Sequence, residues 1–327
     1  MYNREAYEKA MATLNERRSN AIAKAAAFHE EMRMREPRVK EIEQLMAQSS
    51  AKVVQAILQN GNIEREVEKI KTENLSLQVE LSMLLQRYGA TTGNFEPQYT
   101  CPVCQDTGFV GGKQCACLEQ LMREYACMAL TELSAMRPTS FDTMSLEYYS
   151  TQPDARTGIA PRAQMRQVIE YCRAYAKNFD GRDDSLLLRG PTGVGKTHLS
   201  LAIAGELLAK GYSVVYGPVQ QLLHRMEREH FGRADGNTED VLLDCDLLIL
   251  DDVGTEFTSP FYTSALYNVI NGRLMAEKPT IISTNLNQMQ LTERYGEQIA
   301  SRVTGLFEPL VCVGYDIRQQ KLKQSLV

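Results

Sequence analysis

The residues with the clearest chemical meaning form a glycine-rich run, Gly190-Pro191-Thr192-Gly193-Val194-Gly195-Lys196-Thr197, followed by His198. This run matches the pattern G-x-x-x-x-G-K-[ST], whose glycines let backbone N–H groups turn toward a phosphate. A helical pattern follows it directly, so a helix N-terminus adds partial positive charge. We therefore predict a nucleotide site at residues 190–198, in which Lys196 reaches the β and γ phosphates and Thr197 binds Mg²⁺. Without nucleotide, we expect the Lys196 side chain to face solvent.

A second motif places two carboxylates at the end of an apolar run. The run Leu247-Leu248-Ile249-Leu250 ends in Asp251-Asp252. An acidic pair at the carboxyl end of a buried strand can hold a metal ion and polarise an attacking water. A purely structural pair would need partners for its buried charge, which makes that alternative the costly one.

The chain contains eight cysteines. Four of them are clustered, with glycines between the two pairs: Cys101, Cys104, Cys115 and Cys117. Four thiolates can surround one zinc ion and leave no position open for water, so this spacing predicts a structural zinc site. Cys127 is an alternative fourth ligand, and unligated thiols or a redox C-x-x-C are further alternatives. We expect core or surface thiols at the remaining three positions: Cys172, Cys245 and Cys312.

Residues 1 to about 88 have a helical composition and contain one proline, Pro37. Apolar residues recur there in steps of three and four, with Asn74 at one polar position of the series. The later part of this series comprises Ile63, Val67, Ile70, Leu77, Leu81, Leu84 and Tyr88. The earlier part comprises Phe28, Met32, Val39, Ile42, Met46 and Val53. With Asn60-Gly61-Asn62 as the break, these patterns predict an antiparallel helical hairpin, which serves either as a stalk or as a docking surface.

The C-terminal half alternates short apolar runs with helical patterns. Four runs are typical of strands buried on both faces of a parallel sheet: 185–189, 213–216, 246–250 and 280–284. We therefore predict an α/β fold with a parallel sheet, preceded by the helical hairpin and the zinc segment. The predicted domains are a helical partner-docking region (1–90), a zinc-binding segment (91–136) and an ATPase domain (137–327).

The overall composition argues against a strongly basic nucleic-acid-binding protein, a secreted protein and a membrane protein. With 36 Lys and Arg against 41 Asp and Glu, the net charge is −5, so any DNA contact must be a local patch. The charged N-terminus has no apolar core of the kind a signal peptide needs, and no apolar run is long enough to span a membrane. We expect a cytoplasmic protein.

The motifs together carry a resemblance. The segments LLLRGPTGVGKTHLSLAIAGELLAKGYSVVY, DLLILDDVGTE, TIISTNL and ERYGEQIASRV resemble the AAA+ ATPases of the bacterial replicative helicase-loader group, over residues of about 137 to 327. The zinc segment and the helical N-terminus are similar to those of the same loaders. The ATPases that assist insertion-sequence transposases are a sister family and share the ATPase motifs.

The resemblance implies roles for individual residues. Asp251 helps to hold Mg²⁺, and Asp252 stands where many AAA+ proteins have a catalytic Glu. Asn285 matches the polar sensor that positions water against the γ-phosphate. Arg302 matches the finger that reaches the ATP of a neighbouring subunit, and Arg318 lies near the expected sensor arginine of the bound subunit.

The resemblance further implies an ATPase that loads the replicative DNA helicase, with ATP, Mg²⁺ and Zn²⁺ as cofactors. The implied partners are the helicase, single-stranded DNA and further copies of the chain in the ATP state, with no membrane. One alternative is an ATPase regulator of a DNA transposase. A second is a small-molecule kinase, which would not need the sensor and finger residues.

Overall fold

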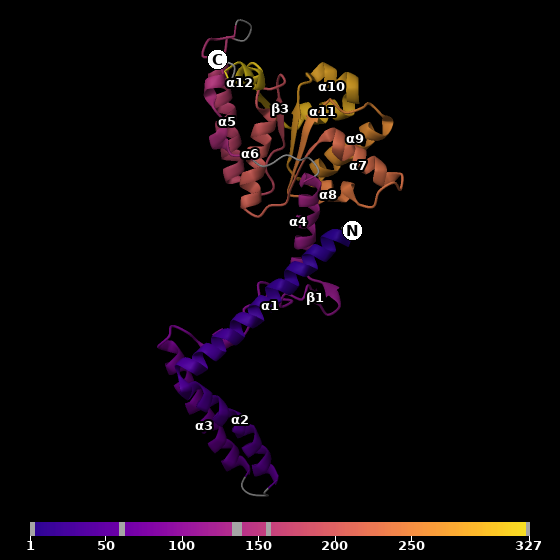
Figure 1. Ribbon diagram of the computed structural model, residues 1–327. Coiled ribbons are helices and arrows are strands. Elements are labelled where there is room, and N and C mark those ends of the chain that lie inside the picture. The colour runs from indigo at the N-terminus through magenta and orange to yellow at the C-terminus, as the bar shows by residue number, and fades with distance from the viewer. Residues whose placement is uncertain (1–3, 59–62, 133–138, 155–157, 325–327) are drawn as a thin grey trace. The chain divides into compact units, whose positions relative to one another are not determined.

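The computed structural model describes residues 4–58, 63–132, 139–154 and 158–324 (Figure 1). The chain divides into two compact units: one comprises Met1–Ala10 with Gln120–Val327, and the other comprises Met11–Glu119. The predicted division at residues 90 and 136 stays a prediction.

The N-terminal elements are long helices. They are α1 (Arg4–Arg35), α2 (Pro37–Leu58) and α3 (Ile63–Gln86). The break between α1 and α2 falls at Glu36. Helix α2 begins with Pro37, which is tolerated at the first helical position because the N–H that proline lacks has no intrahelical partner there. The break predicted at Asn60-Gly61-Asn62 lies outside the described residues.

Helices α2 and α3 form the predicted antiparallel hairpin. Val39 and Ile42 of α2 pack in one apolar cluster with Leu81 and Leu84 of α3. Farther along the hairpin, Ser49 Oγ donates a hydrogen bond to Asn74 Oδ1 at 2.7 Å. The polar position in the heptad series therefore has a polar partner on the facing helix, and that pair fixes the register.

A short irregular region follows the hairpin. Its elements are a 3₁₀ turn η1 (Thr92–Phe95), the antiparallel strands β1 (Phe109–Val110) and β2 (Lys113–Gln114), and α4 (Ala116–Glu132). The four clustered cysteines lie in this region.

The C-terminal unit is built on a five-stranded sheet. Its strands are β3 (Leu186–Arg189), β4 (Val214–Pro218), β5 (Leu247–Val253), β6 (Thr280–Thr284) and β7 (Glu308–Val311), in the order β4-β5-β6-β3-β7. All neighbouring strands pair in parallel, which confirms the predicted sheet class. The sequence did not reveal β7, because this edge strand contains Pro309 and buries only Leu310.

Helices cover both faces of this sheet (Figure 1). On one face, Leu186 and Leu188 pack with α5 (Pro161–Asn178) and α6 (Lys196–Ala209). Leu187 points to the opposite face and packs in the cluster of the other helices. That face is covered by α7 (Val219–His230), α8 (Thr238–Asp244), α9 (Pro260–Met275), α10 (Gln288–Tyr295) and α11 (Glu297–Gly305).

Three short elements complete the unit: η2 (Phe141–Thr143), η3 (Leu146–Tyr148) and α12 (Ile317–Gln324). Because β3, β5 and β6 run parallel, their carboxyl ends meet at one edge of the sheet. That edge is where ligands bind in open α/β sheets.

Candidate functional site

A cavity of about 310 Å³ lies at this edge, above the glycine-rich run. The run connects β3 to α6, and its backbone has positive φ at Gly193 (+78°) and Gly195 (+101°), a conformation that glycine adopts freely. The cavity is lined by several of the predicted site residues: Thr192, Gly193, Gly195, Lys196, Thr197, His198, Asp252 and Arg318. A volume of this size falls in the range of small-molecule sites.

The rest of the lining comes from two segments remote in sequence. The segment before α5 contributes Met144, Tyr148 and Tyr149, and α12 contributes Ile317 and Lys321. Of these two segments, the sequence pointed only to α12, through Arg318; the segment before α5 meets the glycine-rich run only in the folded chain.

Lys196 does not face solvent, contrary to the expectation from the sequence. Its side chain is buried, and Nζ donates hydrogen bonds to the carbonyl oxygens of Gly190 (2.7 Å) and Pro191 (2.8 Å). Burial lowers the pKa of this ammonium group. The reason for the difference is that a buried charge without a ligand must find partners, and the loop's own carbonyls supply them.

Thr197 and Asp251 lie together, as the two motifs predicted. Thr197 Oγ1 donates to Asp251 Oδ2 at 2.9 Å. Asp251 is buried, and two further hydroxyls donate to its carboxylate: Tyr216 from β4 at 2.6 Å, and Ser283 from β6. A hydroxyl and a carboxylate oxygen this close are the hard oxygen donors that Mg²⁺ prefers, so this pair fits the predicted metal.

Asp252 is exposed and points into the cavity. Its backbone φ is +56°, and its β5 neighbours change register against β6 at this point. Although the side chain is exposed, partial desolvation of its carboxyl raises the pKa of Asp252, and the nearby Asp251 charge raises it further. A carboxyl with a raised pKa in a cavity is a candidate for proton transfer.

The C-terminal segment closes onto the glycine-rich run. Ile317 N donates to Gly193 O at 3.0 Å, and Asp316 accepts the backbone N–H of Arg318 at 2.8 Å. A Cβ at Gly193 would come within 2.2 Å of the Asp316 carboxylate carbon. His198 connects the glycine-rich run to the segment before α5, because its Nε2 lies 3.0 Å from Thr143 Oγ1.

Six predicted site residues do not line the cavity: Gly190, Pro191, Val194, Asp251, Asn285 and Arg302. Asn285 follows the end of β6, and its side chain is exposed. Arg302 of α11 donates from Nε to Asn271 Oδ1 at 3.0 Å and lies over the ring of Tyr267 at 5.0 Å. The roles predicted for Asn285 and Arg302 stay predictions.

Glu256, to which the sequence assigned no role, is buried. One carboxylate oxygen accepts the Gly254 N–H at 2.9 Å, and the other pairs with the Tyr295 hydroxyl. These contacts give Glu256 a structural explanation and leave Asp252, near the end of β5, as the acidic residue that lines the cavity.

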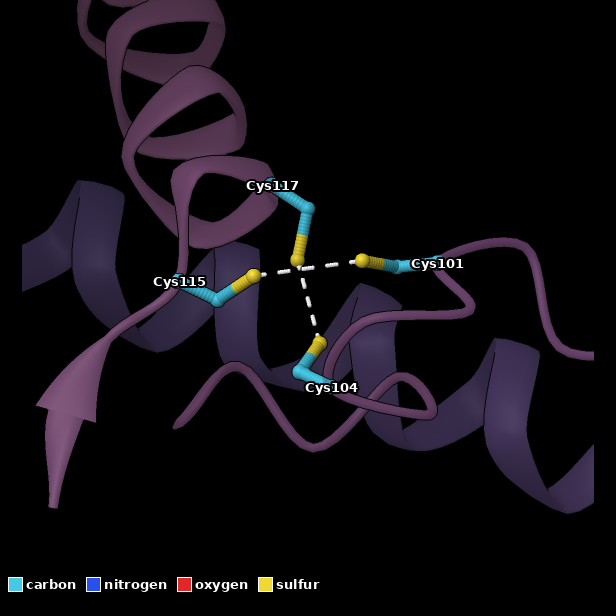
Figure 2. Close-up of side chains that lie close together, drawn as sticks. All are labelled: Cys101, Cys104, Cys115 and Cys117. Carbon is cyan, nitrogen blue, oxygen red and sulfur yellow. Dashed lines mark hydrogen bonds between the residues drawn. The ribbon is translucent and has the colours of Figure 1, made fainter. Parts of the chain in front are cut away.

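The four clustered cysteines converge on one point (Figure 2). Their sulfur atoms all lie within 4.8 Å of one another, with Cys101 and Cys115 3.9 Å apart and Cys104 and Cys117 3.4 Å apart. A tetrahedral site with Zn–S bonds of about 2.3 Å places its sulfurs roughly 3.8 Å apart, so the cluster fits zinc. Cys127 is buried in α4 and is not one of the four.

The backbone around the cluster is set by short-range contacts. The buried carboxylate of Asp106 accepts the N–H groups of Thr100 (2.8 Å) and Cys101 (2.9 Å). Burial raises the pKa of the Cys104 thiol, but hydrogen bonds from Cys117 and its neighbours outweigh this effect and leave the pKa at about 7. Burial and the same hydrogen bonds raise the pKa of Cys117, so without a metal the four thiols share protons, which a bound cation would displace.

Replacing Cys101 and Cys104 with Ser is expected to release about one zinc ion per chain and to unfold residues 101–117. The reason is that structural zinc supplies folding free energy of ~10 kcal/mol in small sites. Metal analysis and limited proteolysis measure both effects, and ATP binding should persist. Cys127→Ala is the matched control and should keep its zinc. Wild-type protein purified without zinc would contradict the assignment.

No helix among the described residues is long and apolar enough to cross a membrane.

Comparisons with known proteins agree with this arrangement. The family described as "IstB-like ATP binding protein" matches residues 158–304. The replicative helicase loader DnaC of Escherichia coli (strain K12) is 28% identical over 197 residues, which cover 59% of this chain and 76% of DnaC. The replicative helicase loader DnaI of Bacillus subtilis (strain 168) is 26% identical over 162 residues, which cover 48% of this chain and 51% of DnaI.

A crystal structure of the DnaC helicase loader matches with a TM-score of 0.44 and 25% identity, over 52% of this chain and 97% of that one. The match of the IstB-like family falls on the segment that contains the glycine-rich run, the acidic pair and Arg302. Residues 158–304 thus form an IstB-like AAA+ ATPase domain, in a chain homologous to the replicative helicase loaders DnaC and DnaI.

Proposed function

We propose that this protein is an ATP-dependent loader of a replicative DNA helicase, acting in the initiation or restart of replication. The observation that carries the ATP part is the contact between Thr197 and Asp251 beside Lys196, at one end of the cavity. Lys196 exchanges its two loop carbonyls for phosphate oxygens, and Thr197 and Asp251 hold Mg²⁺, which screens the phosphate charge. Asp252 orients the attacking water.

The loading part rests on the homology to DnaC and DnaI, whose printed names describe loaders of the replicative helicase. The family match alone does not separate a loader from a transposase regulator. The IstB-like family resembles the ATPases that assist transposases, and these share their ATPase motifs with the loaders. The cysteine cluster and the hairpin favour the loader, because a transposase regulator has no need of either.

The finger role of Arg302 makes the active site a shared one. This residue lies on α11 and not in the lining of its own cavity, so it would exchange its contacts with Asn271 and Tyr267 for the nucleotide of a neighbouring copy. Hydrolysis then depends on assembly, and monomers are nearly inactive.

A patch beside α7 supports binding of single-stranded DNA. His230 lies 5.0 Å from the ring of Phe231 and 5.2 Å from that of Phe261, and the Arg233 guanidinium lies over Phe231 at 5.9 Å. Phe231 and Arg233 are exposed. Aromatic rings beside arginines are the surface on which unpaired bases stack, and such a local patch is compatible with the acidic net charge of the whole chain.

Helix α3 supports docking of the helicase on the hairpin. The face of α3 that does not pack on α2 exposes three apolar residues in steps of four: Leu75 (54% exposed), Val79 (54%) and Met83 (61%). In a helix, this spacing places all three on one stripe. An amphipathic helix of the helicase could lie along the stripe, as in other helix-in-groove complexes.

The test is ATP-dependent transfer of the helicase onto closed circles of single-stranded DNA, which have no end for a ring to thread. Wild-type protein should promote the transfer, and the variant Leu75→Gln/Val79→Gln/Met83→Gln should lose it together with helicase binding, while its ATPase activity stays. Ile22→Gln/Met34→Gln is the matched control, because it makes the same kind of change at exposed apolar residues of α1, and it should keep loading. Stimulation of a transposase without any helicase transfer would overturn the proposal in favour of the alternative.

A further inference from the structure

One buried hydroxyl contacts both members of the acidic pair. Ser283 lies in β6 and is fully buried. Its Oγ donates a hydrogen bond to Asp251 Oδ1 and accepts the backbone N–H of Asp252 at 2.9 Å. The sequence pattern gave no role to Ser283.

The contact with Asp252 bears on how two consecutive carboxylates can serve one site. Adjacent residues of a regular strand point to opposite faces, so two consecutive carboxylates cannot both serve one site. Here Leu250 pairs with Ile282 and Val253 pairs with Thr284, so two residues of β5 oppose Ser283 alone. This is a β-bulge, which re-aims a side chain, and it turns Asp252 into the cavity.

The bulge has two costs that Ser283 reduces. Asp252 adopts a φ of +56°, in the left-handed region that residues with a Cβ avoid. The bulge also removes the Asp252 N–H from the ladder, and a buried N–H without a partner is costly. Ser283 Oγ supplies that partner, so the hydroxyl stabilises the conformation that aims Asp252.

The contact with Asp251 fixes the other carboxylate. Thr197 and Tyr216 both donate to Oδ2, at 2.9 and 2.6 Å, whereas Ser283 donates to Oδ1. The carboxylate plane is therefore held from both oxygens. Rotation of this plane would move Oδ2 away from Thr197, its partner in the predicted Mg²⁺ site.

We propose that Ser283 is a positioning residue for ATP hydrolysis, which through one hydroxyl orients Asp251 and sets the bulge that aims Asp252 at the nucleotide. The inference rests on the ATPase activity under the proposed function. It differs from the sensor role predicted for Asn285, because Asn285 is exposed and does not line the cavity, whereas Ser283 contacts the acidic pair directly.

The test compares Ser283→Ala with Ser200→Ala. Ser200 is also fully buried, in α6, and among the described residues its hydroxyl has no hydrogen-bond partner. Both variants delete one buried oxygen, but only the first removes contacts to the acidic pair. For each we would measure kcat and KM for ATP, the Mg²⁺ concentration that gives half-maximal rate, binding of a fluorescent ATP analogue, and the melting temperature.

For Ser283→Ala we expect kcat to fall about 10-fold or more, because a hydrogen bond to a charged group is lost together with the bulge contact. The KM and analogue binding should stay within about 2-fold of wild type, and the Mg²⁺ requirement should rise. Ser200→Ala should hydrolyse ATP at the wild-type rate.

Wild-type kcat in Ser283→Ala would overturn the proposal, as would a loss of rate accompanied by equal losses of analogue binding and melting temperature. A loss confined to Asn285→Ala would also overturn it and would leave Asn285 as the sensor. Failure of the proposed ATPase itself is a separate result, because it would appear as hydrolysis that does not depend on Lys196.

Discussion

Lys196→Ala is expected to lower ATP hydrolysis to less than about 1% of the wild-type rate, because it removes the cation that the motif directs at the β and γ phosphates. The variant should remain folded. It leaves the carbonyls of Gly190 and Pro191 without their lysine partner, but Gly190 is partly exposed and Pro191 is exposed, so water can replace the ammonium group. Phosphate release at saturating ATP measures the loss, and circular dichroism with thermal melting measures the fold.

Helix α6 offers a matched control for this variant. Lys210, just after its C-terminal end, also donates to two backbone carbonyls, those of Ala176 and Lys177, each at 2.6 Å. Lys210→Ala removes the same number of lysine-to-carbonyl contacts far from the glycine-rich run, so it should hydrolyse ATP at the wild-type rate. If Lys196→Ala behaved like this control, residues 190–198 would not be the nucleotide site.

Arg302→Ala should bind ATP but lose hydrolysis by ~10³-fold or more, because a finger arginine stabilises charge that develops at a neighbour's γ-phosphate. Mixing it with Lys196→Ala should restore part of the rate. In the mixed assembly, one subunit supplies an intact glycine-rich run and the other supplies an intact Arg302, so some sites are complete. Rates are measured with saturating single-stranded DNA, at a range of mixing ratios.

The controls address stability and assembly. Arg173 makes contacts like those of Arg302, with a ring at 5.4 Å (Phe141) and a side-chain oxygen at 3.1 Å (Asp142), but it lies in α5. Arg173→Ala should keep full activity, which separates the finger role from the loss of a surface contact. Light scattering must show that the two variants co-assemble. Wild-type hydrolysis by Arg302→Ala under these conditions would exclude the shared site.

The sequence predicted the parts of this protein whose signal is contiguous. Four strands were recognisable because a strand buried on both faces is a continuous apolar run, as in Leu247–Leu250. The glycine-rich run was recognisable because it matches a fixed spacing within eight consecutive residues. The cysteine cluster was recognisable because its four members span only residues 101–117.

What the sequence could not predict depends on pairing between remote segments. Tyr216 and Ser283 look like ordinary strand residues until the register of β4, β5 and β6 places them against Asp251. The expectation that Lys196 faces solvent was wrong for a similar reason, since the partners of a buried charge depend on loop geometry. Pro309 concealed β7, because proline argues against a strand unless the strand is known to lie at an edge.

The contact between Gly193 and the C-terminal segment links ligand binding in the cavity to the docking of α12. Asp316 occupies the space that a side chain at position 193 would need, and the next residues place Arg318 in the cavity. Thermodynamic reciprocity then applies: a ligand that gains affinity from Arg318 must stabilise the docked state of α12 by the same free energy. Protection of the α12 backbone amides from hydrogen exchange therefore reports on occupancy of the cavity, without any probe attached to the nucleotide.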